Sequence, residues 1–299
     1  KEKDVIVNKK QQFNKKHIIL DIEGTTTSIN FVKDTLFPYI RTNVKPYLLR
    51  TYDGEKTKND IVQILLYIVK IHDSDFDNKV RHDYIQENTD FYALKQILQV
   101  DKHALQHAVK EKIYPAMISK DHILQTINHF VNWAMDRDLK ITPLKQLQGN
   151  MWEEGYASKQ LVGHVYEDAL EAFNFWKEHN HLLYIYSSGS VKAQKLLFGA
   201  TKKGDLKSYF KDHFDTKFPG LKVEASSYKK ILDAITEQGK QPVKGSEVLF
   251  VTDNINEAFA AVEGVQDITC VLSIREDTMK LPEKHPFVTI HSFKELLYD

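Results

Sequence analysis

The chain has 299 residues, and its 41 Lys and Arg side chains balance 41 Asp and Glu side chains. A net charge of zero argues against a general nucleic-acid binder or a polybasic membrane-binding surface, and a single cysteine, Cys270, excludes a disulfide framework or a multi-cysteine zinc site. No apolar run approaches the roughly 20 residues that a membrane-spanning helix needs, so we expect a globular protein of a reducing compartment.

The N-terminal part begins with a polar segment and then reaches an apolar run. Residues 1–16 are rich in lysine and show no apolar core of a secretory signal, and we expect them to form a flexible extension. Residues 17–20 are largely apolar and are followed by Asp21 and Gly24. This pattern predicts a short buried strand that ends in a glycine turn.

The central part of the chain is predicted to be helical. Apolar residues recur at helical spacing in two stretches, formed by Ile61, Ile64, Leu65 and Ile68 and then by Ile123, Ile127, Phe130, Val131 and Ala134. The polar residues 73–78 between these stretches are expected to form a loop. This part therefore reads as a helical module.

Beyond about residue 163, short apolar runs alternate with helical patterns. The runs that we expect to form strands are Leu182–Tyr186, Val248–Val251, Thr269–Leu272 and Phe287–Ile290. Strands that are separated by amphipathic helices predict a parallel sheet with helices on both faces.

The helices of this part have recognisable ends. One carries Ala169, Ala172, Phe173 and Trp176 on one face and can end at Asn180. A second can be capped by Ser226 or Ser227 and ended by Gly239. The segment from Ser292 to Glu295 has the pattern of a capping box, which predicts a last helix.

The first strand is separated from the later ones by the helical region, which predicts an insertion. We therefore expect an α/β fold, in which a Rossmann-like, doubly wound parallel sheet forms the core and a helical cap domain is inserted into it. The core would comprise residues 17–27 and 163–299, and the cap would comprise residues 28–162.

Chemically useful side chains follow the predicted strands, where ligands of doubly wound sheets bind. They are Asp21 and Glu23 after the first strand, Ser187 and Ser188 after the second, Asp253 after the third, and Lys222 before the helix that leads to the third strand. Converging carboxylates suit Mg²⁺, and hydroxyls with a lysine suit a phosphate group. An aspartate can also attack phosphorus and form an aspartyl-phosphate.

Each of these residues also has an ordinary structural interpretation. An aspartate after a strand, such as Asp21 or Asp253, is commonly a turn former or helix cap. The sequence Ser187-Ser188-Gly189 can be a simple loop, and Lys222 can be a solvated surface residue. Their joint occurrence at three strand ends favours the functional interpretation.

The order of these motifs resembles that of the haloacid dehalogenase superfamily, although Glu23 stands where that superfamily usually has a second aspartate. Longer segments resemble the enolase-phosphatases of methionine salvage, namely Leu20–Thr27, Leu36–Ile40, Leu144–Gly149, Tyr184–Gly199 and His213–Lys217. The resemblance implies a Mg²⁺-dependent phosphoric monoester hydrolase. Such an enzyme converts 2,3-diketo-5-methylthiopentyl-1-phosphate through its enol phosphate to the acireductone 1,2-dihydroxy-3-keto-5-methylthiopentene.

The resemblance also implies a role for each site residue. Asp21 matches the nucleophile and a Mg²⁺ ligand, and Glu23 and Asp253 match the other acidic positions of the metal site. Ser187 and Ser188 match the contacts to the substrate phosphate, and Lys222 matches the lysine that neutralises it. The implied partner is a small phosphorylated molecule, without nucleic acid or membrane, bound by a monomer in the cytoplasm or the nucleus.

Some alternatives remain open. The base that enolises the substrate is Glu23 or, as a second candidate, Asp21. Glu257 is either a supporting group of the site or an ordinary first-turn helix residue, and His164 and His213 are expected to be structural. As a whole, the chain could instead be a general sugar-phosphate phosphatase of the same superfamily or a binding module without catalysis.

Overall fold

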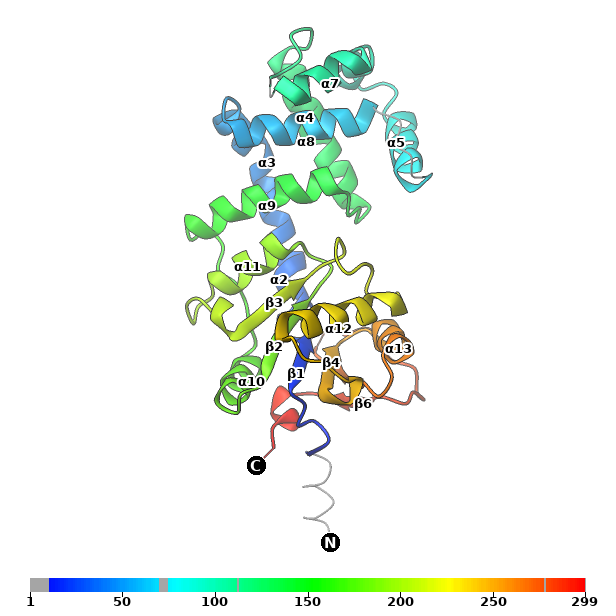
Figure 1. The fold of residues 1–299 in the computed structure, drawn as a ribbon. Coiled ribbons are helices and arrows are strands. Elements are labelled where there is room, and N and C mark those ends of the chain that lie inside the picture. Colours follow the sequence, from blue (N-terminus) through cyan, green and yellow to red (C-terminus); the bar gives the residue numbers. More distant parts are fainter. Residues whose placement is uncertain (1–10, 70–74, 112, 277, 299) are drawn as a thin grey trace. The chain divides into compact units, whose positions relative to one another are not determined.

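The computed structural model describes residues 11–69, 75–111, 113–276 and 278–298, and it divides into two compact units (Figure 1). The core unit consists of Lys1–Thr35 and Tyr156–Asp299, and the inserted unit consists of Leu36–Gly155. The inserted unit is thus shorter at both ends than the insertion 28–162 predicted from the sequence.

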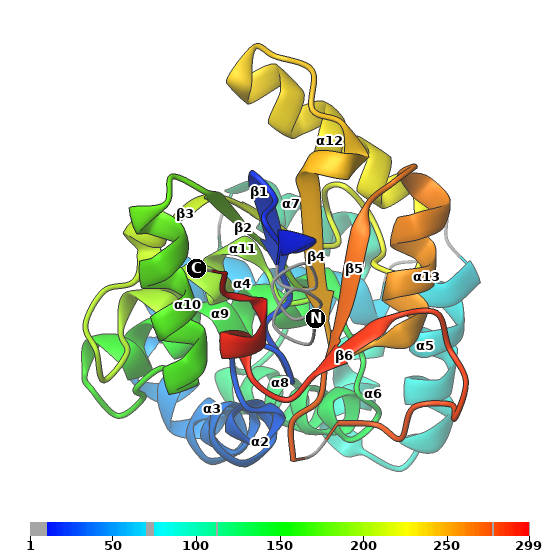
Figure 2. The same cartoon turned by 90° about the horizontal axis from the view of Figure 1, so that it is seen from below.

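The core unit contains a six-stranded sheet in the order β3-β2-β1-β4-β5-β6 (Figure 2). Its strands are β1 (His17–Leu20), β2 (Leu182–Tyr186), β3 (Phe210–Phe214), β4 (Val248–Thr252), β5 (Thr269–Ser273) and β6 (Val288–Ile290). All neighbouring strands are parallel, which confirms the predicted sheet. Strand β3 was not predicted, because the polar Lys211, Asp212 and His213 interrupt its apolar pattern.

The register of the central strands determines where the site lies. Leu20 of β1 lies beside Ile185 of β2 on one side and Val251 of β4 on the other. The residues that follow these three strands therefore emerge at one edge of the sheet. β1 is buried along its whole length, as expected for the centre of a parallel sheet.

Helices cover both faces of the sheet. They are α10 (Glu167–Glu178), α11 (Val191–Gly199), α12 (Ala225–Gly239) and α13 (Ile255–Gly264), with the short α2 (Ile29–Phe31) after the first turn. α12 and α13 share one apolar cluster with the strands, whereas α10 contacts β2 and α11 contacts β3 on the other face (Figure 2). This arrangement confirms the doubly wound fold.

The predicted helix ends are partly confirmed. Asn180 adopts a positive φ of 61° just after α10, so the chain turns there. The predicted cap of α12 is wrong, because Glu224 precedes the helix and Ser226 and Ser227 lie within its first turn. Ser292 does form a capping box with Glu295, at a short 3₁₀ helix.

The inserted unit is helical, as predicted. Its helices are α3 (Phe37–Thr51), α4 (Glu55–Val69), α5 (Asp75–Glu87), α6 (Tyr92–Leu98), α7 (Lys102–Glu111), α8 (Lys120–Asp136) and α9 (Thr142–Ala157), the last of which continues into the core unit. The loop expected at 73–78 is wrong for residues 75–78, which begin α5, while 73 and 74 lie outside the described residues. The first turn of α5 shows no apolar pattern, because its buried anchors Val80 and Tyr84 come later.

The chain segment before β1 is anchored where the structure describes it. Residues 1–10 of the expected flexible extension lie outside the described residues. Phe13 is buried, and the carbonyl of Lys16 accepts a hydrogen bond of 2.8 Å from the amide of Leu182. In the described part of the chain, no helix is long and apolar enough to cross a membrane.

Candidate active site

Asp21 is held at the end of β1 by a tight turn. Its amide donates to the carbonyl of Val251 at 3.0 Å, and its Oδ1 accepts from the amide of Ile22 at 2.7 Å. The turn closes on the Ile22 carbonyl, which accepts from the amides of the three successive threonines Thr25, Thr26 and Thr27 at 3.1, 3.0 and 2.9 Å.

Glycine is needed in this turn at Gly24. Its φ is +72°, which disfavours other residues, and a Cβ added there would lie 2.3 Å from Oδ2 of Asp253. The turn after β1 and the carboxylate after β4 are thus packed directly against each other.

Lys222 reaches into the carboxylate cluster. Its Nζ donates to Oδ1 of Asp21 at 2.6 Å and to Oε2 of Glu257 at 2.8 Å, and its side chain is only 7% exposed. Burial opposes the charge on Lys222, but the attraction of Asp21 and Glu257 outweighs it and raises the pKa of the lysine. Lys222 is therefore a buried cation and not a solvated surface residue.

The carboxylates after β4 are crowded. Burial and the negative charges of Asp21 and Glu257 raise the pKa of Asp253 to about 8. Burial also raises the pKa of Glu257, although its Oε2 accepts a hydrogen bond from Oγ1 of Thr252 at 2.6 Å. Because Glu257 contacts Lys222, the question left open by the sequence is answered in favour of a supporting group.

The donor set at this edge fits Mg²⁺. The negative charge of Asp21 raises the pKa of Asp253, so a proton or a cation must relieve the repulsion between their two carboxylates. Mg²⁺ commonly binds one or two carboxylates and keeps several waters. Among the described residues, no group of three or more His, Cys, Asp or Glu side chains is placed to hold a metal as it stands, so Glu23 as a third ligand stays a prediction.

Ser187 and Ser188 lie in the loop after β2. Ser187 is buried; its amide donates to the carbonyl of Phe214 at 3.2 Å, and its Oγ accepts from the amide of Gly189 at 3.2 Å. Ser188 is half-buried beside it. The loop thus presents two adjacent hydroxyl-bearing residues at the strand end next to that of Asp21.

Gln194 supports this serine loop and was not predicted from the sequence. The buried amide Nε2 donates to the carbonyls of Gly189 and Phe214 at 2.9 and 2.8 Å, and Oε1 pairs with Nδ1 of His213 at 3.0 Å. The signal in the sequence was a single polar residue on the buried side of a helix, which spacing alone does not mark as functional.

The two histidines near the site make structural contacts. Burial, together with the positive charge of Lys195, lowers the pKa of His213 to about 4. The ring Nδ1 of His164 accepts from the amide of Ser28 at 3.1 Å. Neither contact places a ring beside Asp21.

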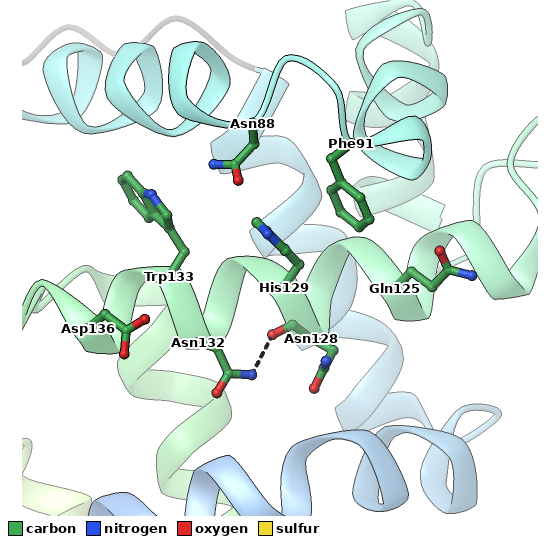
Figure 3. Close-up of a pocket in the computed structure, with 8 residues that line it drawn as sticks. All are labelled: Asn88, Phe91, Gln125, Asn128, His129, Asn132, Trp133 and Asp136. Carbon is green, nitrogen blue, oxygen red and sulfur yellow. Dashed lines mark hydrogen bonds between the residues drawn. The ribbon is translucent and has the colours of Figure 1, made fainter.

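A pocket of about 410 Å³ lies within the inserted unit, on α8 and the segment before α6 (Figure 3). It is lined by Asn88, Phe91, Gln125, Asn128, His129, Asn132, Trp133 and Asp136. This lining has aromatic and amide groups but no lysine and no paired carboxylates, so it does not resemble the phosphate chemistry of the sheet edge.

The chain is similar to known proteins along most of its length. A family model of haloacid dehalogenase-like hydrolases matches residues 15–264. Enolase-phosphatase E1 of Naegleria gruberi is 40% identical over 281 residues, which are 94% of each chain. A probable bifunctional methylthioribulose-1-phosphate dehydratase/enolase-phosphatase E1 of Populus trichocarpa is 40% identical over 93% of this chain and 46% of its own. The crystal structure of the UTR4 protein from Saccharomyces cerevisiae aligns with a TM-score of 0.59 and 31% identity, over 94% of this chain and 99% of that one.

Proposed function

The chain belongs to the enolase-phosphatase family of the haloacid dehalogenase-like hydrolases, and from this premise we propose which residues perform its reaction. It acts as a methionine-salvage phosphatase on 2,3-diketo-5-methylthiopentyl-1-phosphate, which it enolises and then dephosphorylates to the acireductone. The contact between Lys222 and Asp21 in the core unit, at 2.6 Å, is the observation on which the assignment of the phosphatase residues rests.

Asp21 is the proposed nucleophile. Its carboxylate forms a bond to phosphorus while the bond from phosphorus to the enol oxygen breaks, and that oxygen takes up a proton. Water then attacks the aspartyl-phosphate, releases inorganic phosphate and regenerates Asp21. The turn after β1 fixes the carboxylate in place for both displacements.

Lys222 offsets negative charge in both steps. As a buried cation it lies against the carboxylate of Asp21, and it can neutralise the phosphoryl oxygens during transfer. Glu257 holds the ammonium group from the other side. Ser187 and Ser188 donate hydroxyl hydrogen bonds to the substrate phosphate.

Asp21 and Asp253, with Glu23 as a further candidate, are the residues that would hold Mg²⁺. When bound, this ion would polarise a phosphoryl oxygen and stabilise an enediolate. Glu23 is our first candidate for the base that removes the carbon-bound proton, because its side chain is one methylene longer than that of aspartate, and Asp21 is the second.

Two isosteric variants separate the chemical steps. Asp21→Asn should lose phosphate release, yet at high Mg²⁺ it should still form the enol phosphate slowly, whereas Glu23→Gln should block both steps. Ultraviolet absorbance of the enol and a phosphate assay are followed together, with Asp233→Asn on an exposed face of α12 as the control.

The outcomes distinguish the alternatives. Enol formation by Glu23→Gln, or none by metal-loaded Asp21→Asn, would move the base role to Asp21. Full phosphate release by Asp21→Asn would overturn the assignment of Asp21 as the nucleophile. Release from small sugar phosphates but none from the diketo substrate would indicate a general phosphatase.

A further inference from the structure

A guanidinium group binds the turn that carries Asp21. Arg275 follows β5, and its Nε and Nη2 both donate to the carbonyl oxygen of Thr25, at 3.2 and 3.0 Å. Its third nitrogen, Nη1, donates to Oδ2 of Asp168 at 2.9 Å. One planar side chain thus links the turn after β1 to the first turn of α10.

This link is enclosed by the core unit. The side chains of Arg275 and Asp168 are 10% and 14% exposed. The guanidinium carbon lies 4.0 Å from the ring centre of Tyr166 and 5.3 Å from that of Phe293, and the amide of Phe293 also donates to Asp168, at 2.8 Å. The surroundings therefore restrict the guanidinium to one orientation.

The bonded carbonyl belongs to the turn that positions the nucleophile. The amide of Thr25 donates to the carbonyl of Ile22, the residue next to Asp21. The following carbonyl, of Thr26, accepts from the amide of Tyr166 at 2.9 Å. The turn is thus held from within by its own amides and from outside by Arg275 and Tyr166.

We propose that Arg275 is a positioning residue for the reaction: by fixing the Thr25 carbonyl it holds the carboxylate of Asp21 in its attacking orientation. This inference rests on the proposed role of Asp21. An apolar side chain could fill the same volume, but it could not donate to the carbonyl. A lysine could pair with Asp168 as a point charge, but it lacks the planar fork that bonds both partners at once.

The test must separate positioning from stability. Arg275→Met removes the link but leaves Asp168 as a buried charge without its cation, which destabilises the fold. Arg275→Met/Asp168→Asn removes that charge as well, while the amide oxygen can still accept from Phe293. Lys294→Met is the matched control, because it removes an ion pair to Glu171 of α10, at 2.9 Å, without touching the turn.

Three quantities are measured at saturating Mg²⁺: kcat with the diketo phosphate, the inhibition constant of inorganic phosphate, and amide hydrogen exchange at Thr25, Thr26 and Thr27. For Arg275→Met we expect kcat to fall about 10- to 100-fold, as for a small displacement of a reacting group. The inhibition constant should stay within about twofold, because the phosphate contacts are intact. Exchange at the three threonines should become about tenfold faster or more.

The double variant decides between the two roles. It should recover the thermal midpoint of the wild type but keep the low kcat and the fast exchange, while Lys294→Met should match the wild type in all three quantities. Recovery of kcat in the double variant, or wild-type kcat and exchange in Arg275→Met, would overturn the proposal.

The outcome stays decisive if the methionine variants fail to fold or if Asp21 is not the nucleophile. If neither methionine variant folds, Arg275→Lys takes their place, with the same fall in kcat expected at an unchanged phosphate inhibition constant, and a wild-type kcat would overturn the proposal. If Asp21 is not the nucleophile, Asp21→Asn retains phosphate release, and this failure is visible without any Arg275 variant.

Discussion

Lys222 is held by contacts to both its side chain and its main chain. It is buried between two carboxylates, Asp21 and Glu257, and Oη of Tyr228 donates to its backbone carbonyl at 2.6 Å. Its main chain and its ammonium group are therefore both fixed. Removing the ammonium group would leave two buried negative charges without their cation.

Lys222→Ala should raise KM and lower kcat together, because we propose that the lysine binds the phosphate in the ground state and offsets charge during transfer. We expect kcat/KM to fall about 10²-fold or more, as for loss of one donor to developing charge. Steady-state kinetics checks this, with Lys294→Ala as the control. An almost unchanged kcat/KM would mean that another group neutralises the phosphate.

His213 should make folding stability depend on pH. Burial holds its pKa at about 4 in the folded state, below the ordinary 6.5. As the pH falls from 6.5 towards 4, His213 binds a proton in the unfolded chain but stays neutral in the folded chain. The free energy of unfolding therefore decreases over this pH range. Between pH 7 and pH 5 the expected loss is about 2 kcal/mol.

Urea unfolding of wild type and His213→Gln at both pH values isolates this contribution, because all other groups titrate in both proteins. The variant should lack the loss of about 2 kcal/mol, and His291→Gln, at an exposed position, should retain it. Equal pH dependence in all three proteins would assign the loss to other groups.

Among the elements, α12 and α13 set the position of the lysine. Gly264 ends α13 against the start of α12, and a Cβ added to it would lie 2.0 Å from the carbonyl oxygen of Ala225. Ala225 is three residues from Lys222. The close approach of these two helix ends therefore determines where the segment that carries Lys222 joins the start of α12.

Gly264→Ala should force these helix ends apart. We expect a loss of about 1–3 kcal/mol in the free energy of unfolding, as for overpacking against backbone, and a fall in kcat/KM. The control is Gly239→Ala at the end of α12, where an added Cβ meets nothing within 4 Å. Calorimetry and kinetics on both variants test this, and equal behaviour of the two would contradict it.

The sequence predicted the elements that bury a continuous apolar face. The strands β1, β2, β4 and β5 and the buried face of α10 were found because parallel strands and amphipathic helices have strong patterns. β3 was missed because its polar residues mask the alternating apolar pattern, and the start of α5 was missed because three of its first four residues are polar.

The sequence also named the groups with obvious chemistry but not their supports. Asp21, Lys222 and Asp253 were found from their places after or between strands. Thr252 and Arg275 were not, because the bond from Thr252 to Asp21 and the bond from Arg275 to Thr25 each join segments more than 200 residues apart, and no local spacing marks such partners.

At the scale of the whole chain, every residue that we propose to handle the phosphate belongs to the core unit. The inserted unit, Leu36–Gly155, supplies none of them. We therefore expect the inserted unit to set the preference for the methylthio tail and the core unit to supply phosphate release.

Exchanging the inserted unit for that of another phosphatase of the superfamily tests this division. The chimera should keep phosphate release from small phosphomonoesters but lose its preference for the diketo substrate. Phosphate assays on both substrates give the ratio of kcat/KM values. A folded chimera with unchanged preference would show that the core unit also selects the tail.

The position of β1 has a consequence for synthesis. This strand is translated before the other five strands of the sheet, and its neighbours β2 and β4 begin only at Leu182 and Val248. At about 5–20 residues per second, the segment that bears Asp21 waits on the order of 10 to 50 s for both partners, while the inserted helices have already been made. The nascent chain thus has to keep four adjoining buried positions, His17–Leu20, from pairing elsewhere, and the centre of the core unit's sheet can assemble only after β4 has been translated.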